Sequence, residues 1–358
     1  MAELGGPTPP PYDPAYAVRL GLFVKTAYWM YDNAVPPGNP TPVAPTPVQP
    51  DYDFVGWVQM KDFFLKEEDY SFYGILAQNQ SNPNRFVLAI RGTRSDSEWW
   101  VDIRSQEQVL FPNFGPGPCY VGVGFYKVYK TLRVVTPSRA QGAGATSAVQ
   151  SLESVGNFAA QVAAAMRLHA AGGALLSELD ALPPSAPMSV QVVGHSLGSA
   201  LATLYVAENT TLLPNRQVIT PLLCTLASPY VGDPGFAAAF NALPYASWRI
   251  VNTMDIVPDL PIEIPGLEYW QGVNTEYDYD SGWNGTWPTP GCWHSLETYL
   301  HLLDSNQPLL KECQPLLVRK RPAPLAVTTA LPHPADKEIA IAAPAQQGTT
   351  INITIKVG

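Results

Sequence analysis

A five-residue turn, GHSLG at 194–198, constrains the fold of this chain more than any other feature. The apolar run SVQVV at 189–193 precedes it, and the helix-forming stretch SALATL at 199–204 follows it. A strand that enters a helix through so tight a turn needs glycines, which let helix and strand approach closely. Such a turn holds its central residue, Ser196, in a strained conformation at the carboxyl edge of a sheet. Ser196 is therefore a candidate nucleophile; the alternative is a solvated serine in an ordinary turn.

Apolar runs and helical periodicity alternate along the chain and predict its fold class. Strands are expected at 70–78, 85–91, 189–193, 222–227 and 248–252, and helices at 14–31, 151–182 (with a bend near 172–173), 197–208 and 294–303. The run FVLAI at 86–90 lacks alternation, which is typical of a strand covered on both faces. The pattern predicts an α/β fold with a mostly parallel central sheet flanked by helices.

Composition divides the chain into three parts. Residues 1–12 are rich in proline and glycine and are expected to be flexible, 13–314 carry the alternating elements, and 315–358 begin with a Pro/Ala-rich linker. Within the central part, the proline-rich stretch 36–50 is expected to be an extended connector. The last eight residues, 351–358, alternate apolar and polar side chains. Such a strand needs a sheet edge, so it could pair with a second copy and form a homo-oligomer.

Charge and hydropathy exclude several partners. The net charge is −9 and lysine and arginine do not cluster, so nucleic acid is not an expected partner. No run of 18 apolar residues is present, so no transmembrane helix is expected. The N-terminus lacks the basic and apolar regions of a secretory leader. Secretion, with the leader absent from this sequence, is favoured over a cytoplasmic location.

The four cysteines do not suggest a metal site, because none lies in a CxxC pair. Asp278 and Asp280 lack a later glutamate in the position that a calcium loop needs. We therefore expect neither a metal nor another cofactor. Cys224 lies in an apolar run and is expected to be a buried thiol, whereas Cys292 and Cys313 could form a disulfide, which spacing alone does not establish.

A serine nucleophile needs a base, ordinarily a histidine that a carboxylate orients. After such a turn the chain order is serine, acid, histidine. His294 begins a predicted helix, so a loop can present it to the site. It is favoured over His301, two turns further along, and over His333 in the Pro/Ala-rich tail.

The acid is expected just past a strand end. Asp255 follows the 248–252 strand and is the first candidate, with Asp259 as the alternative and Asp233 a more distant one. Each could instead cap a turn, as most loop aspartates do.

The oxyanion that forms when a serine attacks a carbonyl carbon needs two backbone N–H donors. One is expected from Leu197, directly after the nucleophile, and the other from the loop after an earlier strand. In that loop Gly92 allows close approach and Thr93 can offer its N–H and its hydroxyl. Asp102 could accept from that hydroxyl.

Residues 94–111 contain tryptophans among charged residues. Trp99 and Ile103 are four residues apart and would share a helix face, and Trp100 lies in the same segment. The pattern is typical of a short amphipathic helix, and the alternative is an ordinary packed surface helix. The aromatic stretch 269–293 could form a wall of the substrate pocket or pack on itself.

Five segments, in order, resemble the fungal-type class 3 lipase family of α/β-hydrolases: AIRGTRSDSEWWVDI (89–103), VGHSLGSALATL (193–204), LASPYVGD (226–233), VNTMDIVPDLP (251–261) and WHSLETYL (293–300). The resemblance covers about residues 15–305 and makes 13–314 an α/β-hydrolase domain. It implies that the amphipathic segment 94–111 is a short lid that opens at an oil–water interface. It implies a triad of Ser196, Asp255 and His294, with Thr93 and Leu197 as oxyanion donors and with Trp99 and Asp102 in the segment after the oxyanion residue.

The resemblance implies a serine carboxylic-ester hydrolase that binds a lipid or ester substrate, with a lipase acting on acylglycerols favoured. A phospholipase A1 or a feruloyl-type esterase would share all these residues. Outside the enzymes, the alternative is a catalytically silent binding protein of the same fold.

Overall fold

The computed structural model describes residues 10–61, 69–94, 106–138, 149–182, 186–211, 218–261, 270–273, 275–282 and 289–314. All of them belong to one compact unit of the chain. The expected C-terminal strand at 351–357 and most of the expected flexible N-terminus lie outside the described residues.

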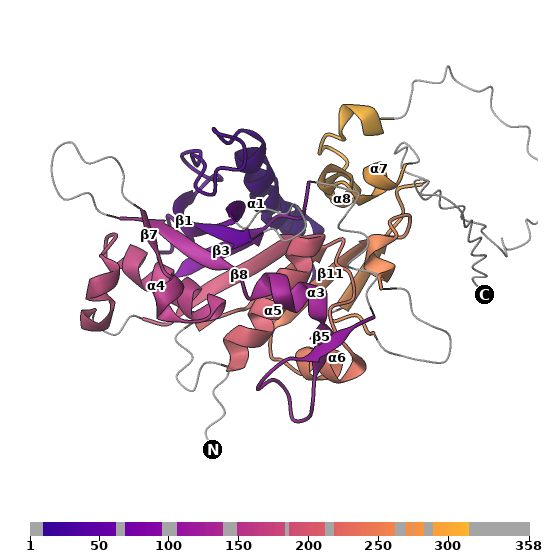
Figure 1. Ribbon diagram of the computed structural model, residues 1–358. Coiled ribbons are helices and arrows are strands. Elements are labelled where there is room, and N and C mark those ends of the chain that lie inside the picture. The colour runs from indigo at the N-terminus through magenta and orange to yellow at the C-terminus, as the bar shows by residue number, and fades with distance from the viewer. Residues whose placement is uncertain are drawn as a thin grey trace, which may run out of the picture. The chain divides into compact units, whose positions relative to one another are not determined.

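A ten-stranded mixed sheet forms the centre of the described part, with the order β12-β11-β10-β8-β3-β2-β1-β6-β7 and with β9 beside β8 (Figure 1). The strands are β1 (Tyr52–Lys61), β2 (Tyr70–Asn79), β3 (Arg85–Ile90), β6 (Arg133–Pro137), β7 (Val149–Ser151), β8 (Met188–His195), β9 (Val218–Ile219), β10 (Leu222–Leu226), β11 (Ala246–Asn252) and β12 (Thr275–Tyr279). From β3 to β12 neighbouring strands are parallel, as expected. From β3 towards β7 they are antiparallel.

Helices cover both faces of the sheet. The helices of the described part are α1 (Pro14–Asp32), α3 (Val123–Tyr129), α4 (Phe158–Ala170), α5 (Leu197–Thr211), α6 (Pro234–Asn241), α7 (Pro290–His294) and α8 (Leu296–Leu303). Helices α1 and α8 pack on one face, and α3, α4 and α5 lie on the other (Figure 1). Side chains of β3 alternate between the two cores: Phe86, Leu88 and Ile90 join the α5 side, and Val87 and Ala89 join the α1 side. The expectation that this strand is covered on both faces is confirmed.

Helix α1 begins as its sequence predicts. The Asp13 side chain accepts a hydrogen bond from the Ala15 N–H at 3.0 Å, and Pro14 occupies the first turn. The helix also reaches the central strand, because the Tyr16 hydroxyl donates to Gln191 of β8 at 2.6 Å. No helix of the described residues is long and apolar enough to cross a membrane.

Two predicted helices are divided in the structure. The expected helix at 151–182 is α4 alone, flanked by 3₁₀ turns at Glu153–Val155 and Leu176–Ala181. The Asn157 side chain caps its start, and Gly172 and Gly173, with φ of 78° and 77°, follow its end. The helix expected at 294–303 is interrupted at Ser295, whose side chain caps α8 instead.

Candidate active site

The serine turn connects β8 to α5 with very little space. Ser196 has a φ of 58°, which is rare for a residue with a side chain and marks local strain. A Cβ on Gly194 would collide with the backbone of Gly198, and one on Gly198 would collide with the carbonyl of Ile90. The predicted need for both glycines therefore has a direct steric cause.

One imidazole joins the serine to a carboxylate. The Nε2 of His294 lies 2.7 Å from Oγ of Ser196, and its Nδ1 lies 2.8 Å from Oδ2 of Asp255. The Asp255 side chain is 1% exposed, and that of His294 is 16% exposed. The structure thus brings together the three residues that the sequence singled out, at hydrogen-bond distances suited to proton transfer.

The alternative base and the alternative acids make other interactions or lie in other elements. His301 Nδ1 lies 2.7 Å from the carbonyl oxygen of Gln307. Asp233 caps α6 by accepting from the Phe236 N–H at 2.7 Å. Asp259 ends a 3₁₀ turn, Val257–Asp259, and burial raises the pKa of its carboxyl group.

A tyrosine that sequence reasoning missed holds the acid. The Tyr299 hydroxyl donates to Oδ2 of Asp255 at 2.8 Å and accepts from the Asn252 N–H at 3.1 Å. Oδ1 of Asp255 accepts from the Val257 N–H at 3.0 Å, so both carboxylate oxygens are engaged. Burial, with the nearby Asp255 charge, raises the pKa of Tyr299 well above its ordinary value, so the hydroxyl keeps its proton. No local motif marks Tyr299; it reaches the site because α8 packs beside β11.

The two residues expected to donate to the oxyanion are next to the nucleophile or follow a residue that is. Leu197 is the first residue of α5, where a backbone N–H lies outside the helical hydrogen-bond ladder. Thr93 follows Gly92, where an added Cβ would lie 2.9 Å from the Ser196 Cβ. The Gly92 N–H itself donates to the Tyr28 hydroxyl at 2.9 Å, so it is not a donor for an oxyanion.

Most of the proposed lid lies outside the described residues, including Trp99, Trp100, Asp102 and Ile103. Its last part is a strand: β4 (Gln108–Leu110) pairs antiparallel with β5 (Tyr120–Gly122). A helical lid therefore does not extend over 108–110.

Several described aromatic residues of 269–293 contact segments that lie far away in the sequence. Tyr277 stacks on Tyr12 with ring centroids 3.6 Å apart, and the Tyr279 hydroxyl lies 2.7 Å from that of Tyr12. Trp270 is buried, and its indole N–H donates to Gln106 at 2.7 Å. These residues therefore pack against other segments of the chain rather than on one another; Trp283 and Trp287 lie outside the described part.

The family model for class 3 lipases matches residues 87–264. This segment belongs to the class 3 lipase family. With its serine turn between a parallel strand and a helix, and with its acid past a later strand, the fold is that of an α/β-hydrolase.

Curated relatives of the class 3 lipase segment include plant proteins. Phospholipase A1-II 4 of Oryza sativa subsp. japonica is 37% identical over 118 residues, covering 32% of this chain and 28% of the relative. Phospholipase A1-II 3 of Oryza sativa subsp. indica is 29% identical over 237 residues, covering 62% and 49%. The chain thus spans half or less of the length of these relatives. Among solved structures, lipase II from Rhizopus niveus has a TM-score of 0.47 at 20% identity, covering 75% of this chain and 82% of that one.

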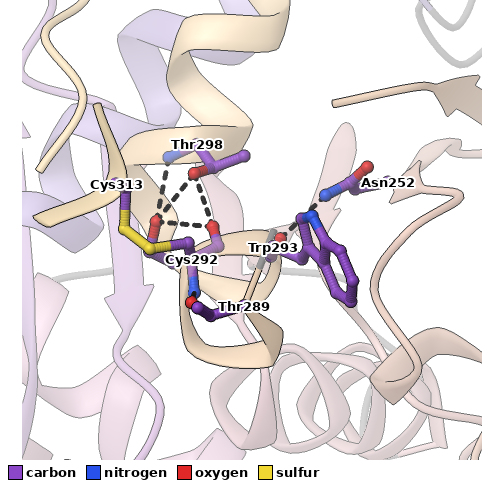
Figure 2. Close-up of a disulfide and its surroundings, with 7 residues drawn as sticks. Asn252, Thr289, Cys292, Trp293, Thr298 and Cys313 are labelled. Atoms are coloured by element: carbon purple, nitrogen blue, oxygen red, sulfur yellow. Dashed lines mark hydrogen bonds between the residues drawn. A yellow bond between two sulfur atoms is a disulfide. The ribbon is translucent and has the colours of Figure 1, made fainter. Parts of the chain in front are cut away.

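The class 3 lipase match includes Ser196 and Asp255 but ends before His294. The turn that carries this histidine is held by a disulfide between Cys292 and Cys313, with Cα atoms 5.3 Å apart (Figure 2). The Cys292 carbonyl also accepts from the Thr298 hydroxyl at 2.6 Å. On the other side of the turn, the Asn252 side chain donates to the Trp293 carbonyl at 2.8 Å (Figure 2). Several bonds thus fix the backbone that presents the imidazole.

Among the described residues, no group of three His, Cys, Asp or Glu side chains is placed to hold a metal ion.

Proposed function

We propose that this chain is a serine carboxylic-ester hydrolase that acts as a lipase on acylglycerols. The observation that carries the proposal is the pair of short contacts made by His294, 2.7 Å to the Ser196 oxygen and 2.8 Å to the Asp255 oxygen. A hydroxyl, an imidazole and a buried carboxylate in this order form the constellation that activates serine.

The reaction follows from this geometry in two halves. Neutral His294 takes the proton of Ser196 as its oxygen attacks the ester carbonyl, and then delivers that proton to the leaving alcohol. Water, deprotonated by the same imidazole, then attacks the acyl-enzyme and releases the acid. Asp255 orients the ring and stabilises the imidazolium that forms in each half.

The backbone N–H groups of Thr93 and Leu197 would receive the oxyanion of the tetrahedral intermediate. Each such donor typically accelerates the reaction on the order of 10²–10³-fold. No step requires a cofactor.

Phospholipase A1 is the second candidate, and the names of the rice relatives favour it. Both activities use the same triad on an ester of glycerol, and the difference lies in the alcohol side of the substrate. A feruloyl-type esterase would again need only a different pocket. A silent binding protein is disfavoured because the hydrogen-bonded triad is complete.

A substrate panel tests the proposal on wild type and Ser196→Ala. The panel contains triacylglycerols of several acyl lengths, a diacyl phospholipid and a feruloyl ester. We expect triacylglycerol hydrolysis, labelling of Ser196 by a fluorophosphonate, and loss of activity in the variant of about 10⁴–10⁶-fold.

Ser247→Ala is a matched control, because the buried Ser247 hydroxyl has no hydrogen-bond partner among the described residues and lies on β11, away from the nucleophile turn. Its activity should equal that of wild type. Retained activity in Ser196→Ala would refute the serine mechanism, and a clear preference for phospholipid would replace the lipase by a phospholipase A1.

A further inference from the structure

A line of hydrogen bonds behind the triad connects the oxyanion loop with the backbone of the base. The Gly92 N–H donates to the Tyr28 hydroxyl at 2.9 Å, and this hydroxyl lies 2.9 Å from Nδ1 of His195. The other ring nitrogen of His195, Nε2, lies 2.9 Å from the carbonyl oxygen of His294. We propose that Tyr28 and His195 are positioning residues that keep the oxyanion loop and His294 in register with Ser196. This inference rests on the proposed function.

The direction of each bond follows from its partners. A carbonyl oxygen only accepts, so Nε2 of His195 carries the proton and donates to His294. Burial and the neighbouring His294 lower the pKa of His195 well below its ordinary value, so the ring is neutral and Nδ1 accepts from Tyr28. Burial raises the pKa of Tyr28 to about 12, so its hydroxyl keeps the proton that it donates. The chain of donors therefore runs from Gly92 through Tyr28 and His195 to His294.

The two side chains are enclosed. Tyr28 is 8% exposed and His195 is 3% exposed. The Arg94 guanidinium lies 4.6 Å from the centroid of the Tyr28 ring and pairs with Asp32, one turn further along α1. Helix α1 thus contacts the oxyanion loop through both hydrogen bonding and charge.

Loss of one hydroxyl would leave two buried groups without a partner, the Gly92 N–H and Nδ1 of His195. Each could recover a partner only by moving, and movement here displaces either the oxyanion loop or the imidazole. Displacements of about 1 Å near reacting atoms can slow catalysis by about 10²-fold.

The same helix supplies a matched control. The Tyr16 hydroxyl donates to the Gln191 side chain at 2.6 Å. Tyr16→Phe therefore breaks a bond between α1 and β8, as Tyr28→Phe does. Gln191 lies four residues before His195 on β8 and contacts neither Gly92 nor His294 through this bond.

The experiment compares wild type, Tyr28→Phe and Tyr16→Phe on a soluble short-chain ester. Active sites are counted by fluorophosphonate titration carried to completion, and the unfolding midpoint is measured for each variant. We expect similar small losses of thermal stability in both variants. Only Tyr28→Phe should lower kcat per titrated site, by about tenfold or more, with KM within about twofold.

If wild type is active and Tyr28→Phe has the same kcat as Tyr16→Phe, the positioning role is wrong and the proposed function stands. A wild type that neither hydrolyses esters nor reacts with the phosphonate would overturn both.

A second pair of variants tests His195 directly. Glutamine can both donate and accept, whereas leucine can do neither. The kcat of His195→Gln should therefore be about fivefold or more higher than the kcat of His195→Leu. Equal kcat in the two variants, each counted per titrated site, would contradict the proposal.

Discussion

The carboxylate of Asp255 accepts hydrogen bonds from an imidazole, a phenol and a backbone amide, and is shielded from solvent. Tyr299→Phe removes the phenol donor and also leaves the Asn252 N–H without its partner. Because the acid would then be held by fewer bonds, we expect kcat to fall about tenfold with little change in KM. A tenfold fall corresponds to the free energy of about one hydrogen bond to a charged group. Steady-state kinetics on a soluble ester measure the change.

Tyr205→Phe is the control for this prediction, because the buried Tyr205 hydroxyl has no hydrogen-bond partner in the structure. It should leave kcat unchanged. Equal kinetics for both phenylalanine variants would refute a role for Tyr299 in holding the acid.

At the scale of single residues, a site residue could be predicted when the sequence near it shows its role. Ser196 lies in a turn that its own glycines dictate, and Asp255 directly follows a strand. His294 follows from chain order. Tyr28 and Tyr299 were not predicted, because their hydroxyls meet their partners only after α1 and α8 pack on the sheet, and no spacing near either residue encodes that contact.

Between elements, a partly buried carboxylate connects α5, α4 and α3. Glu208 accepts from the Tyr129 hydroxyl at 2.6 Å and from the Ala159 N–H at 3.1 Å. Burial raises the pKa of Glu208, so the folded state binds this proton more tightly than the unfolded state. The stability that this proton contributes is present at acidic pH and is lost as the pH rises through the raised pKa.

Glu208→Gln has no such titration. The free energy of unfolding of this variant, minus that of wild type, should therefore increase when the pH is raised from about 4 to about 7, because only wild type loses stability over this range. Urea unfolding across this range measures the difference. A constant difference would contradict the assigned cause.

The disulfide gives a second prediction between elements. It closes a loop of 21 residues and joins the turn that carries His294 to the 3₁₀ turn Lys311–Cys313. Reduction should lower the free energy of unfolding by about 3 kcal/mol and reduce activity. Denaturant unfolding with and without dithiothreitol measures it.

The double variant Cys292→Ser/Cys313→Ser is the control, because it lacks the bond and should not respond to dithiothreitol. The other two cysteines, Cys119 and Cys224, are buried free thiols in both proteins. A response of the double variant equal to that of wild type would assign the effect to these thiols instead.

Elements with an uninterrupted pattern were predicted and irregular ones were not. The strands β3, β8, β10 and β11 were predicted to within about two residues from their apolar runs. Strand β1 was not, because its pairing with β2 shifts register between Phe54 and Gly56 and again between Val58 and Gln59, which breaks the alternation. Strand β12 was missed because its side chains are mostly exposed and its partner strand supplies the order.

For the whole molecule, the two helical layers share a single sheet. Phe23 of α1 and Leu204 of α5 are fully buried on opposite faces. Each change to alanine should lower the free energy of unfolding by about 3 kcal/mol or more. Because the strands belong to both cores, we expect one transition in each variant, with near- and far-ultraviolet circular dichroism changing together. Separate transitions would show that the layers unfold independently.

The alternation of strands and helices predicted the layered architecture, and the parallel half of the sheet that carries the site followed from it. The pairing of β1 with β6 was not predicted, since it spans 70 or more residues of chain and depends on tertiary packing rather than on a local turn.

The order of the site residues along the chain has a consequence for biosynthesis. Helix α1, which carries Tyr28, is translated before the nucleophile turn, and His294 and its disulfide are translated after that turn. The ribosome therefore releases Ser196 before it makes His294, and a nascent chain cannot assemble the triad until the segment with His294 has folded next to Ser196.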